Sequence, residues 1–445
     1  MYKDYISWID LLLVPVYFVV LYAIMVYIKK RHPNDILYQK YFLKGFTFKI
    51  ACTILYCLLI YFYWGFGDSI NYFKNVLLVK QLIKEGTESF GILLQKSTYL
   101  KDNYSASGTS TDGGWFVERI ALILSYFTFS RFIVTSMVFA TLAYAGMFKM
   151  LQTFAAEMPE WHKKLAFAVL FFPTLSIYGS GILKDTLCIT SMGWLVYCSN
   201  ELFVKKRFRI RYIVILVLCF SIIYFVKAYI IAAFMVPYVI YLIAGLVKRI
   251  QSKFFRQVFF PLLLALLVLG YVLNAQKIDN LLGSYAIEKL FDTVKEQQQS
   301  YLTAEDAEAG SVFNIGTIEP TLSGFLKKMP AGIVAALYRP FLWESRNFLM
   351  IFTAMESFLL LFVTLFVLWK TGFVFFIKTI FRDRFVFLCI FYALIFAALV
   401  GLSTSNFGTL ARYRIPIIPF YLAGIIGIWY RFYVKDRKKP RESTE

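Results

Sequence analysis

The sequence predicts an all-α polytopic integral membrane protein with about eleven transmembrane helices and additional interfacial helices. Of its 445 residues, 59% are hydrophobic and only 17% are charged. Soluble domains are about 45–50% apolar and about 25% charged. The apolar residues gather in stretches of about 20 residues, the length at which a helix crosses a bilayer. The basic residues lie mainly in short polar segments between these stretches.

The candidate spans follow one another along the whole chain, which we treat as a single transmembrane domain over residues 1–445. The weakly charged MYKDYISWID precedes the first span, 8–28, and no A-x-A-like cleavage site follows it, so we expect a retained helix. The other ten candidates are residues 46–66, 131–150, 165–180, 186–203, 212–227, 228–247, 257–273, 348–369, 385–402 and 414–430.

The distribution of charge predicts the orientation. Twenty-four Lys and Arg, with five acids, lie in the polar segments 29–44, 204–211, 248–256, 370–384 and 431–445. The long loops 67–130 and 274–347 are neutral or acidic. By the positive-inside rule the basic segments, including the tail 431–445, face the cytoplasm. Both long loops and the N-terminus are then extracytoplasmic. The net charge of +20 therefore reflects membrane topology, and we expect no nucleic-acid partner.

Three further segments are predicted to lie along the membrane surface. Residues 115–129, WFVERIALILSYFTF, are short and contain Glu118–Arg119. If they crossed, the later basic segments would lie outside, so we predict an interfacial or re-entrant helix. Residues 371–384 resemble a cytoplasmic counterpart. In the second long loop, residues 281–294 show helical apolar spacing, which predicts an amphipathic helix.

The positions of the cysteines and histidines argue against disulfide bonds in the loops and against a zinc site. All six cysteines fall within apolar segments, so no disulfide framework is expected in the exposed loops. The two histidines lie far apart, and no Cys/His cluster has the spacing of a zinc site.

Charged residues near the predicted outer face are the candidate functional groups. Lys184–Asp185 end the segment FFPTLSIYGSGILKD, in which Gly179 and Gly181 would leave the backbone open for a ligand. Asp68 follows the second span. The remaining candidates are Arg412 and Arg414 in TLARYRIPIIP, and Arg339 and Glu344 in LYRPFLWESRN, which precedes a span containing Glu356.

These residue types suit transfer of a sugar from a lipid-linked donor. Arginine binds phosphate oxygens in a bidentate manner. A carboxylate can deprotonate an attacking hydroxyl group, and positive charge stabilises a departing diphosphate. On the outer face, where nucleotide sugars are absent, the donor would be a polyprenyl phosphate or diphosphate.

Each group also has a structural interpretation, which the sequence leaves open. Lys184–Asp185 could close a turn as a local ion pair, and Asp68 could cap a helix. Arg412 and Arg414 could anchor to lipid headgroups, and Trp343–Glu344 could lie in the aromatic belt.

The motifs FFPTLSIYGSGILKD, YRPFLWESRN and LARYRIPIIPFYLAGI together resemble bacterial proteins of exopolysaccharide and O-antigen assembly. These are the Wzy- and EpsG-like polymerases and, more distantly, the GT-C glycosyltransferases. The chain lacks the paired acidic motif that GT-C enzymes carry after the first span.

The resemblance implies an enzyme of the bacterial inner (cytoplasmic) membrane that joins polyprenyl-diphosphate-linked oligosaccharide repeat units on its outer face. It assigns catalysis to Asp68 and Asp185. It suggests that Arg412 and Arg414 bind the diphosphate. We add Tyr413, Lys184, Arg339 and Glu344 as candidate substrate-binding residues. The resemblance implies no cofactor, and the alternative is that the enzyme uses a divalent metal ion. The implied partners are the lipid-linked saccharide, membrane lipid and other polysaccharide-assembly proteins.

Two other classes remain open. A transporter or flippase of lipid-linked saccharides is opposed by the long outer loops, the lack of a repeat and the few ionisable residues within the spans. Glu356 and Lys227 inside apolar segments keep it open. Long outer loops also suit a non-catalytic assembly scaffold.

Overall fold

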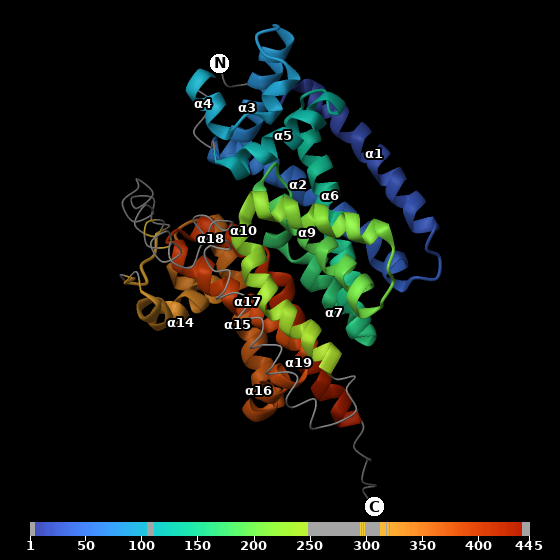
Figure 1. The fold of residues 1–445 in the computed structure, drawn as a ribbon, viewed down its shortest axis with the longest axis vertical. Coiled ribbons are helices and arrows are strands. Elements are labelled where there is room, and N and C mark those ends of the chain that lie inside the picture. Colours follow the sequence, from blue (N-terminus) through green and yellow to red (C-terminus); the bar gives the residue numbers. More distant parts are fainter. Residues whose placement is uncertain are drawn as a thin grey trace, which may run out of the picture. The chain divides into compact units, whose positions relative to one another are not determined.

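The computed structural model describes residues 5–104, 111–247, 312–316 and 321–437, together with residues 294, 296, 298, 318 and 319. The chain divides into two compact units. Unit 1 comprises Met1–Ala156 and Ala166–Lys227, and unit 2 comprises Glu157–Leu165 and Ala228–Glu445. The described residues form helices (Figure 1), and their one β-bridge is isolated, between Val312 and Asn406.

Eight helices in the described part of the chain are long and apolar enough to cross a membrane, which confirms an all-α membrane protein. Seven of them lie close to predicted spans. The eighth, Ile210–Val247, covers two predicted spans. The eight are Trp8–Lys30, Tyr38–Trp64, Phe132–Glu157, Lys184–Val204, Ile210–Val247, Phe348–Thr371, Arg384–Ser403 and Ile417–Lys435.

Three differences separate the eleven predicted spans from the eight helices: one span is divided, two are joined in one element, and one lies outside the described residues. Residues 165–180 are divided among short helices, because Phe172 is extended (φ −72°, ψ 120°) and Pro173 starts a new helix. Predicted spans 212–227 and 228–247 form the single element α10 (Ile210–Val247), which is broken at Lys227 (φ −153°, ψ 75°). Residues 257–273 and most of the predicted amphipathic helix 281–294 lie outside the described residues.

Unit 1 begins with α1 (Trp8–Lys30), η1 (Tyr38–Phe42), α2 (Leu43–Leu58) and η2 (Leu59–Trp64). The first predicted loop is helical in most of its described residues. It contains α3 (Asp68–Lys84), η3 (Phe90–Leu94), α4 (Ser97–Tyr104) and α5 (Asp112–Phe127). Unit 1 continues with most of α6 (Phe132–Glu157), then η5 (Phe167–Phe171), α8 (Pro173–Tyr178), α9 (Lys184–Ser199), η6 (Asn200–Val204) and the first part of α10.

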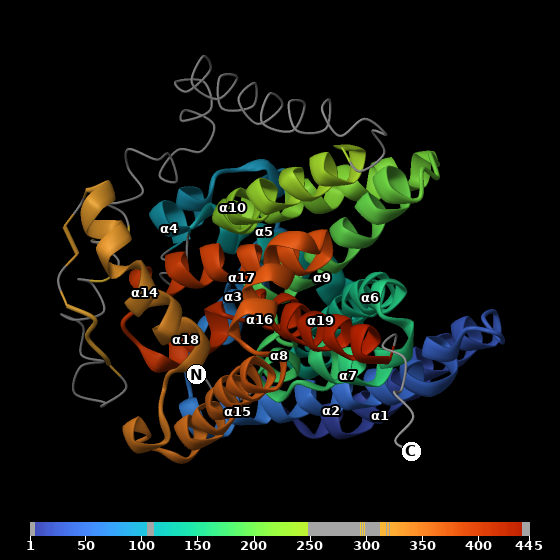
Figure 2. The same cartoon turned by 90° about the horizontal axis from the view of Figure 1, so that it is seen from below.

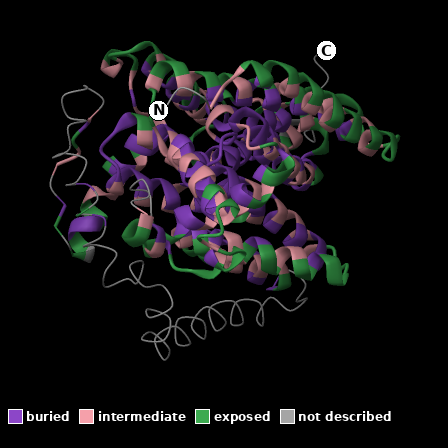
Figure 3. Ribbon diagram, turned by 90° about the horizontal axis from the view of Figure 1, so that it is seen from above, coloured by how far each residue is buried: buried purple, intermediate pink, exposed green. Residues whose placement is uncertain are grey.

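Within unit 1, α2 packs against α1 and α8, and α3 packs against α5. Helix α1 keeps most of its apolar side chains exposed, with only Asp10 and Met25 buried. Such a surface suits contact with lipid. Figure 3 shows buried residues mainly on the helix faces that meet other helices.

Unit 2 contains η4 (Pro159–Trp161), most of α7 (His162–Ala166) and the second part of α10. It continues with α14 (Leu322–Tyr338), η9 (Leu342–Glu344), α15 (Phe348–Thr371), α16 (Phe373–Arg382), α17 (Arg384–Ser403), α18 (Phe407–Tyr413) and α19 (Ile417–Arg437). Helices α17 and α19 lie side by side (Figures 1 and 2). Helix α17 also packs against α14.

Glycines allow close helix crossings in both units. A Cβ atom on Gly193 of α9 would lie 2.0 Å from the carbonyl oxygen of Gly146 in α6. In unit 2, a Cβ atom on Gly401 of α17 would lie 1.9 Å from the carbonyl oxygen of Gly332 in α14. Membrane helices associate through such small residues because their backbones can then approach closely.

Candidate functional site

Lys184 and Asp185 begin helix α9, and their side chains have different partners. Asp185 is fully buried and accepts a hydrogen bond from Lys227 Nζ at 2.5 Å, which also makes an ion pair. Lys184 Nζ donates to Thr111 Oγ1 at 2.8 Å, and Thr111 caps helix α5. The cation bound to Asp185 in this ion pair therefore comes from α10, 42 positions away along the chain.

The backbone of residues 179–183 is irregular and buried by protein. Two of its polar groups have partners within unit 1: Ile182 N donates to Ser69 Oγ at 3.1 Å, and Thr186 Oγ1 donates to Gly181 O at 2.7 Å. A Cβ atom on Gly181 would lie 2.1 Å from the Tyr56 ring. Protein fills the space at this glycine, which does not fit the prediction that the backbone is open there for a ligand.

Lys49 of helix α2 is fully buried at the end of α8, a feature that the sequence analysis missed. Its Nζ donates to Ser176 O at 3.0 Å, and a Cβ atom on Gly179 would lie 3.2 Å from it. The carbonyl groups at a helix C-terminus carry partial negative charge, which favours a cation there. Lys49 therefore holds the broken segment 172–183 against α2. In the sequence, this feature was indicated by a lone lysine within the apolar segment 46–66.

Asp68 is the first residue of α3 and is partly exposed. The residue that caps this helix is Gly67, in a left-handed conformation (φ 139°), so the interpretation of Asp68 as the cap is wrong. Ser69 follows it and binds the Ile182 amide, so segments 64–73 and 179–185 lie together in unit 1. A carboxylate in the first turn of a helix is stabilised by the helix dipole.

Glu118 of α5 is a second buried carboxyl group in unit 1 that the sequence analysis did not assign to the site. Asn75 Nδ2 of α3 donates to Glu118 Oε1 at 2.8 Å. Burial raises the pKa of Glu118 to about 7, while the Asn75 hydrogen bond and the charge of Lys184 oppose this shift. Glu118 thus titrates near neutral pH.

Arg414 is the most buried of the candidate residues in unit 2, at 1% exposed. Its Nη1 donates to Ser357 Oγ at 2.7 Å and to the Arg339 carbonyl oxygen at 3.3 Å. Its Nη2 lies 3.8 Å from Glu356 Oε2. Arg414 therefore joins α15 to the segment that follows α14, which is a positioning role.

Arg339 and Glu344 form a bidentate ion pair beside the same segment. Arg339 Nε donates to Glu344 Oε1 and Oε2 at 3.0 and 3.1 Å, and Nη2 contacts Oε1. The guanidinium group also lies over the rings of Phe313 and Phe407, 4.7 and 5.3 Å from their centroids. Burial opposes ionisation of Glu344, but hydrogen bonds from Arg339 and the Phe341 amide outweigh it and lower the pKa. These contacts favour the charged form of Glu344.

Arg412 and Tyr413 end helix α18 and are partly exposed. The Arg412 guanidinium lies 5.5 Å from the Tyr413 ring centroid. Residues two positions apart on a helix point about 200° apart. Arg412 and Arg414 therefore differ in exposure despite their proximity in sequence, and Arg412 is the better placed to reach a ligand.

The candidate residues thus form one group within each unit. Asp68, Lys184 and Asp185 belong to unit 1, whereas Arg339, Glu344, Arg412, Tyr413 and Arg414 belong to unit 2. Among the described residues, no cluster of three or more His, Cys, Asp or Glu side chains could hold a metal ion. Comparisons with family models, curated proteins and solved structures find no match to this chain.

Proposed function

We propose that this protein is a membrane glycosyltransferase that joins polyprenyl-diphosphate-linked oligosaccharide units on the outer face of a bacterial cytoplasmic membrane. The observation that carries the proposal is the arginine group of unit 2. Arg414 binds the backbone of Arg339 and side chains of α15, while Arg412 stays partly exposed beside it in sequence. Arg414 thus anchors the chain at the end of α18, and the Arg412 guanidinium group can bind diphosphate oxygens in a bidentate manner.

In the proposed reaction, an acceptor sugar hydroxyl attacks the anomeric carbon of the donor. The bond from that carbon to the diphosphate oxygen breaks, and the diphosphate leaves with the electron pair. The hydroxyl proton passes to a carboxylate. Asp68 is the better candidate for this base because it is partly exposed, whereas Asp185 is fully buried and paired with Lys227.

Buried charges in the apolar helices favour a second candidate, a transporter of lipid-linked saccharides. These charges are Lys49, the Asp185–Lys227 pair and the Glu356–Arg414 pair. Ionisable groups at membrane depth commonly mark ion or substrate pathways. Impairing a polymerase would stop chain lengthening, whereas impairing a transporter would stop single repeat units from reaching the outer leaflet.

The test is the surface polysaccharide of the native host carrying Arg412→Ala or Asp68→Asn. We expect each variant to lose the long-chain ladder on a gel while single repeat units still reach the outer leaflet. Removal of one hydrogen-bond donor that stabilises developing charge reduces turnover by about 10²–10³-fold in other enzymes. Arg346→Ala is the matched control, because Arg346 is an exposed arginine of the YRPFLWESRN motif. It should keep the ladder at equal membrane levels.

Two outcomes would contradict the polymerase proposal. A normal ladder in both variants would show that these two charges are not needed for polymerisation. Failure of single repeat units to reach the outer leaflet would instead support the transporter.

A further inference from the structure

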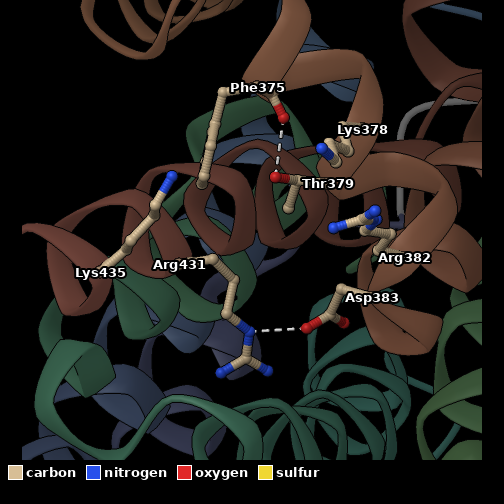
Figure 4. Close-up of a pocket in the computed structure, with 7 residues that line it drawn as sticks. All are labelled: Phe375, Lys378, Thr379, Arg382, Asp383, Arg431 and Lys435. Atoms are coloured by element: carbon tan, nitrogen blue, oxygen red, sulfur yellow. Dashed lines mark hydrogen bonds and ion pairs between the residues drawn. The ribbon is translucent and has the colours of Figure 1, made fainter.

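A basic pocket in unit 2 lies apart in sequence from the residues assigned to sugar transfer. It has a volume of about 370 Å³ and is formed by helices α16 and α19 and the start of α17. Figure 4 shows Arg431 and Lys435 of α19 facing Lys378, Arg382 and Asp383 across it. The lining residues are Phe375, Lys378, Thr379, Arg382, Asp383, Arg431 and Lys435.

The pocket has an excess of positive charge. Asp383 accepts a hydrogen bond from Arg431 Nε at 2.6 Å, and Glu157 lies 3.9 Å from Arg431 Nη2. The positive charge of Arg431 is therefore balanced by nearby carboxylates. Asp383 also caps α17 through the amides of Phe385 and Val386. Lys378, Arg382 and Lys435 form no ion pair with a carboxylate of the described residues. Three positive charges therefore surround a space that has room for an anion.

Helix α16, which supplies two of these charges, has the amphipathic pattern of a helix that lies in a membrane interface. Phe373, Val374, Ile377 and Phe381 are exposed and share one face of α16. Lys378, Arg382 and Phe375 lie on the adjoining face, which lines the pocket, and Thr379 and Ile380 are buried. A short helix with an exposed apolar face beside a basic face inserts at the boundary between headgroups and acyl chains.

We propose that this pocket binds the headgroup phosphate of an anionic phospholipid. The phosphate oxygens accept hydrogen bonds from Lys378, Arg382 and Lys435, and the acyl chains run along the exposed apolar face of α16. Basic pockets between transmembrane helices bind anionic headgroups in this way. A soluble phosphate compound would satisfy the same cations but would leave the apolar face unused. The inference does not depend on the proposed sugar transfer.

The test is lipid binding to the purified full-length protein in neutral detergent, measured by native mass spectrometry. Phosphatidylglycerol and phosphatidylcholine with identical acyl chains are titrated separately. We expect preferential binding of phosphatidylglycerol, weakened about 30-fold in the double variant Lys378→Gln/Arg382→Gln. Each charge contributes about fivefold near an anionic surface. Lys435→Gln is a milder variant, expected to weaken binding about fivefold.

The matched control is Lys163→Gln/Lys370→Gln, which removes two exposed charges of unit 2 outside the pocket. It should retain the affinity of the natural sequence. Unchanged binding in the pocket variants, or an equal loss in the control, would overturn the proposal. Displacement of the lipid by millimolar inorganic phosphate would identify a soluble phosphate compound as the ligand instead.

Discussion

Replacing Lys227 by methionine is expected to lower the free energy of unfolding by about 3–5 kcal/mol, the cost of breaking a buried ion pair by removing one partner. Asp185 is fully buried and Lys227 is 7% exposed, so water does not compensate for the lost charge. The measurement is thermal unfolding of the purified protein in detergent, together with its yield as a monodisperse species.

A double-mutant cycle tests whether this effect belongs to the pair. Asp185→Asn combined with Lys227→Met removes both charges and should recover part of the lost stability, with a coupling free energy of about 1–3 kcal/mol. Lys184→Met is the matched control, because Lys184 adjoins Asp185 but donates to Thr111 at a more exposed site. It should cost less than about 1 kcal/mol. A larger loss from Lys184→Met than from Lys227→Met would refute the assigned pairing.

The second large effect is a pH dependence caused by Glu118. Its folded-state pKa is raised from 4.5 to about 7. Between these values the folded state binds more protons than the unfolded state, so stability falls as pH rises and becomes constant above about pH 7. A shift of this size corresponds to about 3 kcal/mol. Glu118→Gln should remove this decrease.

The measurement is the melting temperature between pH 5 and pH 8 for the natural sequence and the variant. Glu85→Gln provides the control, because it removes an exposed carboxyl group at the end of α3. It should leave the pH profile unchanged. If Glu118→Gln keeps the full decrease in stability above pH 5, then Glu118 is ionised throughout this range and the burial argument is wrong.

The long helices were predictable because length and hydropathy alone determine whether a segment can span a bilayer. Residues 348–369 and 385–402 were predicted, and the helices found are Phe348–Thr371 and Arg384–Ser403. The predicted span 165–180 does not appear as one helix, because Pro173 interrupts a segment whose composition remains apolar. Composition does not detect such a break, although the proline was a local signal.

The pairing of charges was less predictable, because it depends on contacts between segments distant in sequence. Asp185 lies beside Lys184 in the chain but pairs with Lys227, 42 positions away. A lone lysine within the apolar segment 212–247 required an anionic or polar partner, yet nothing local identified Asp185. Similarly, Gly181 suggested open backbone, whereas the structure uses it to admit the Tyr56 ring.

The site residues themselves remain predictions, with roles narrowed by geometry. Arg414 was expected to contact the diphosphate, but it is 1% exposed and bonded to Ser357 and the Arg339 backbone. Its neighbour Arg412 is partly exposed. Both arginines lie at the end of α18, and contacts with the distant residues Ser357 and Arg339 bury Arg414. The sequence alone could therefore not assign ligand contact to one arginine rather than the other.

The central claim, that this protein extends a lipid-linked saccharide, is tested most directly by reconstitution. The purified protein is incorporated into liposomes with polyprenyl-diphosphate-linked repeat units and no ion gradient, and the products are separated by size. The account predicts saccharides of several repeat units that remain attached to one polyprenyl diphosphate, with release of the other. Movement of single units across the bilayer without any increase in chain length would contradict it.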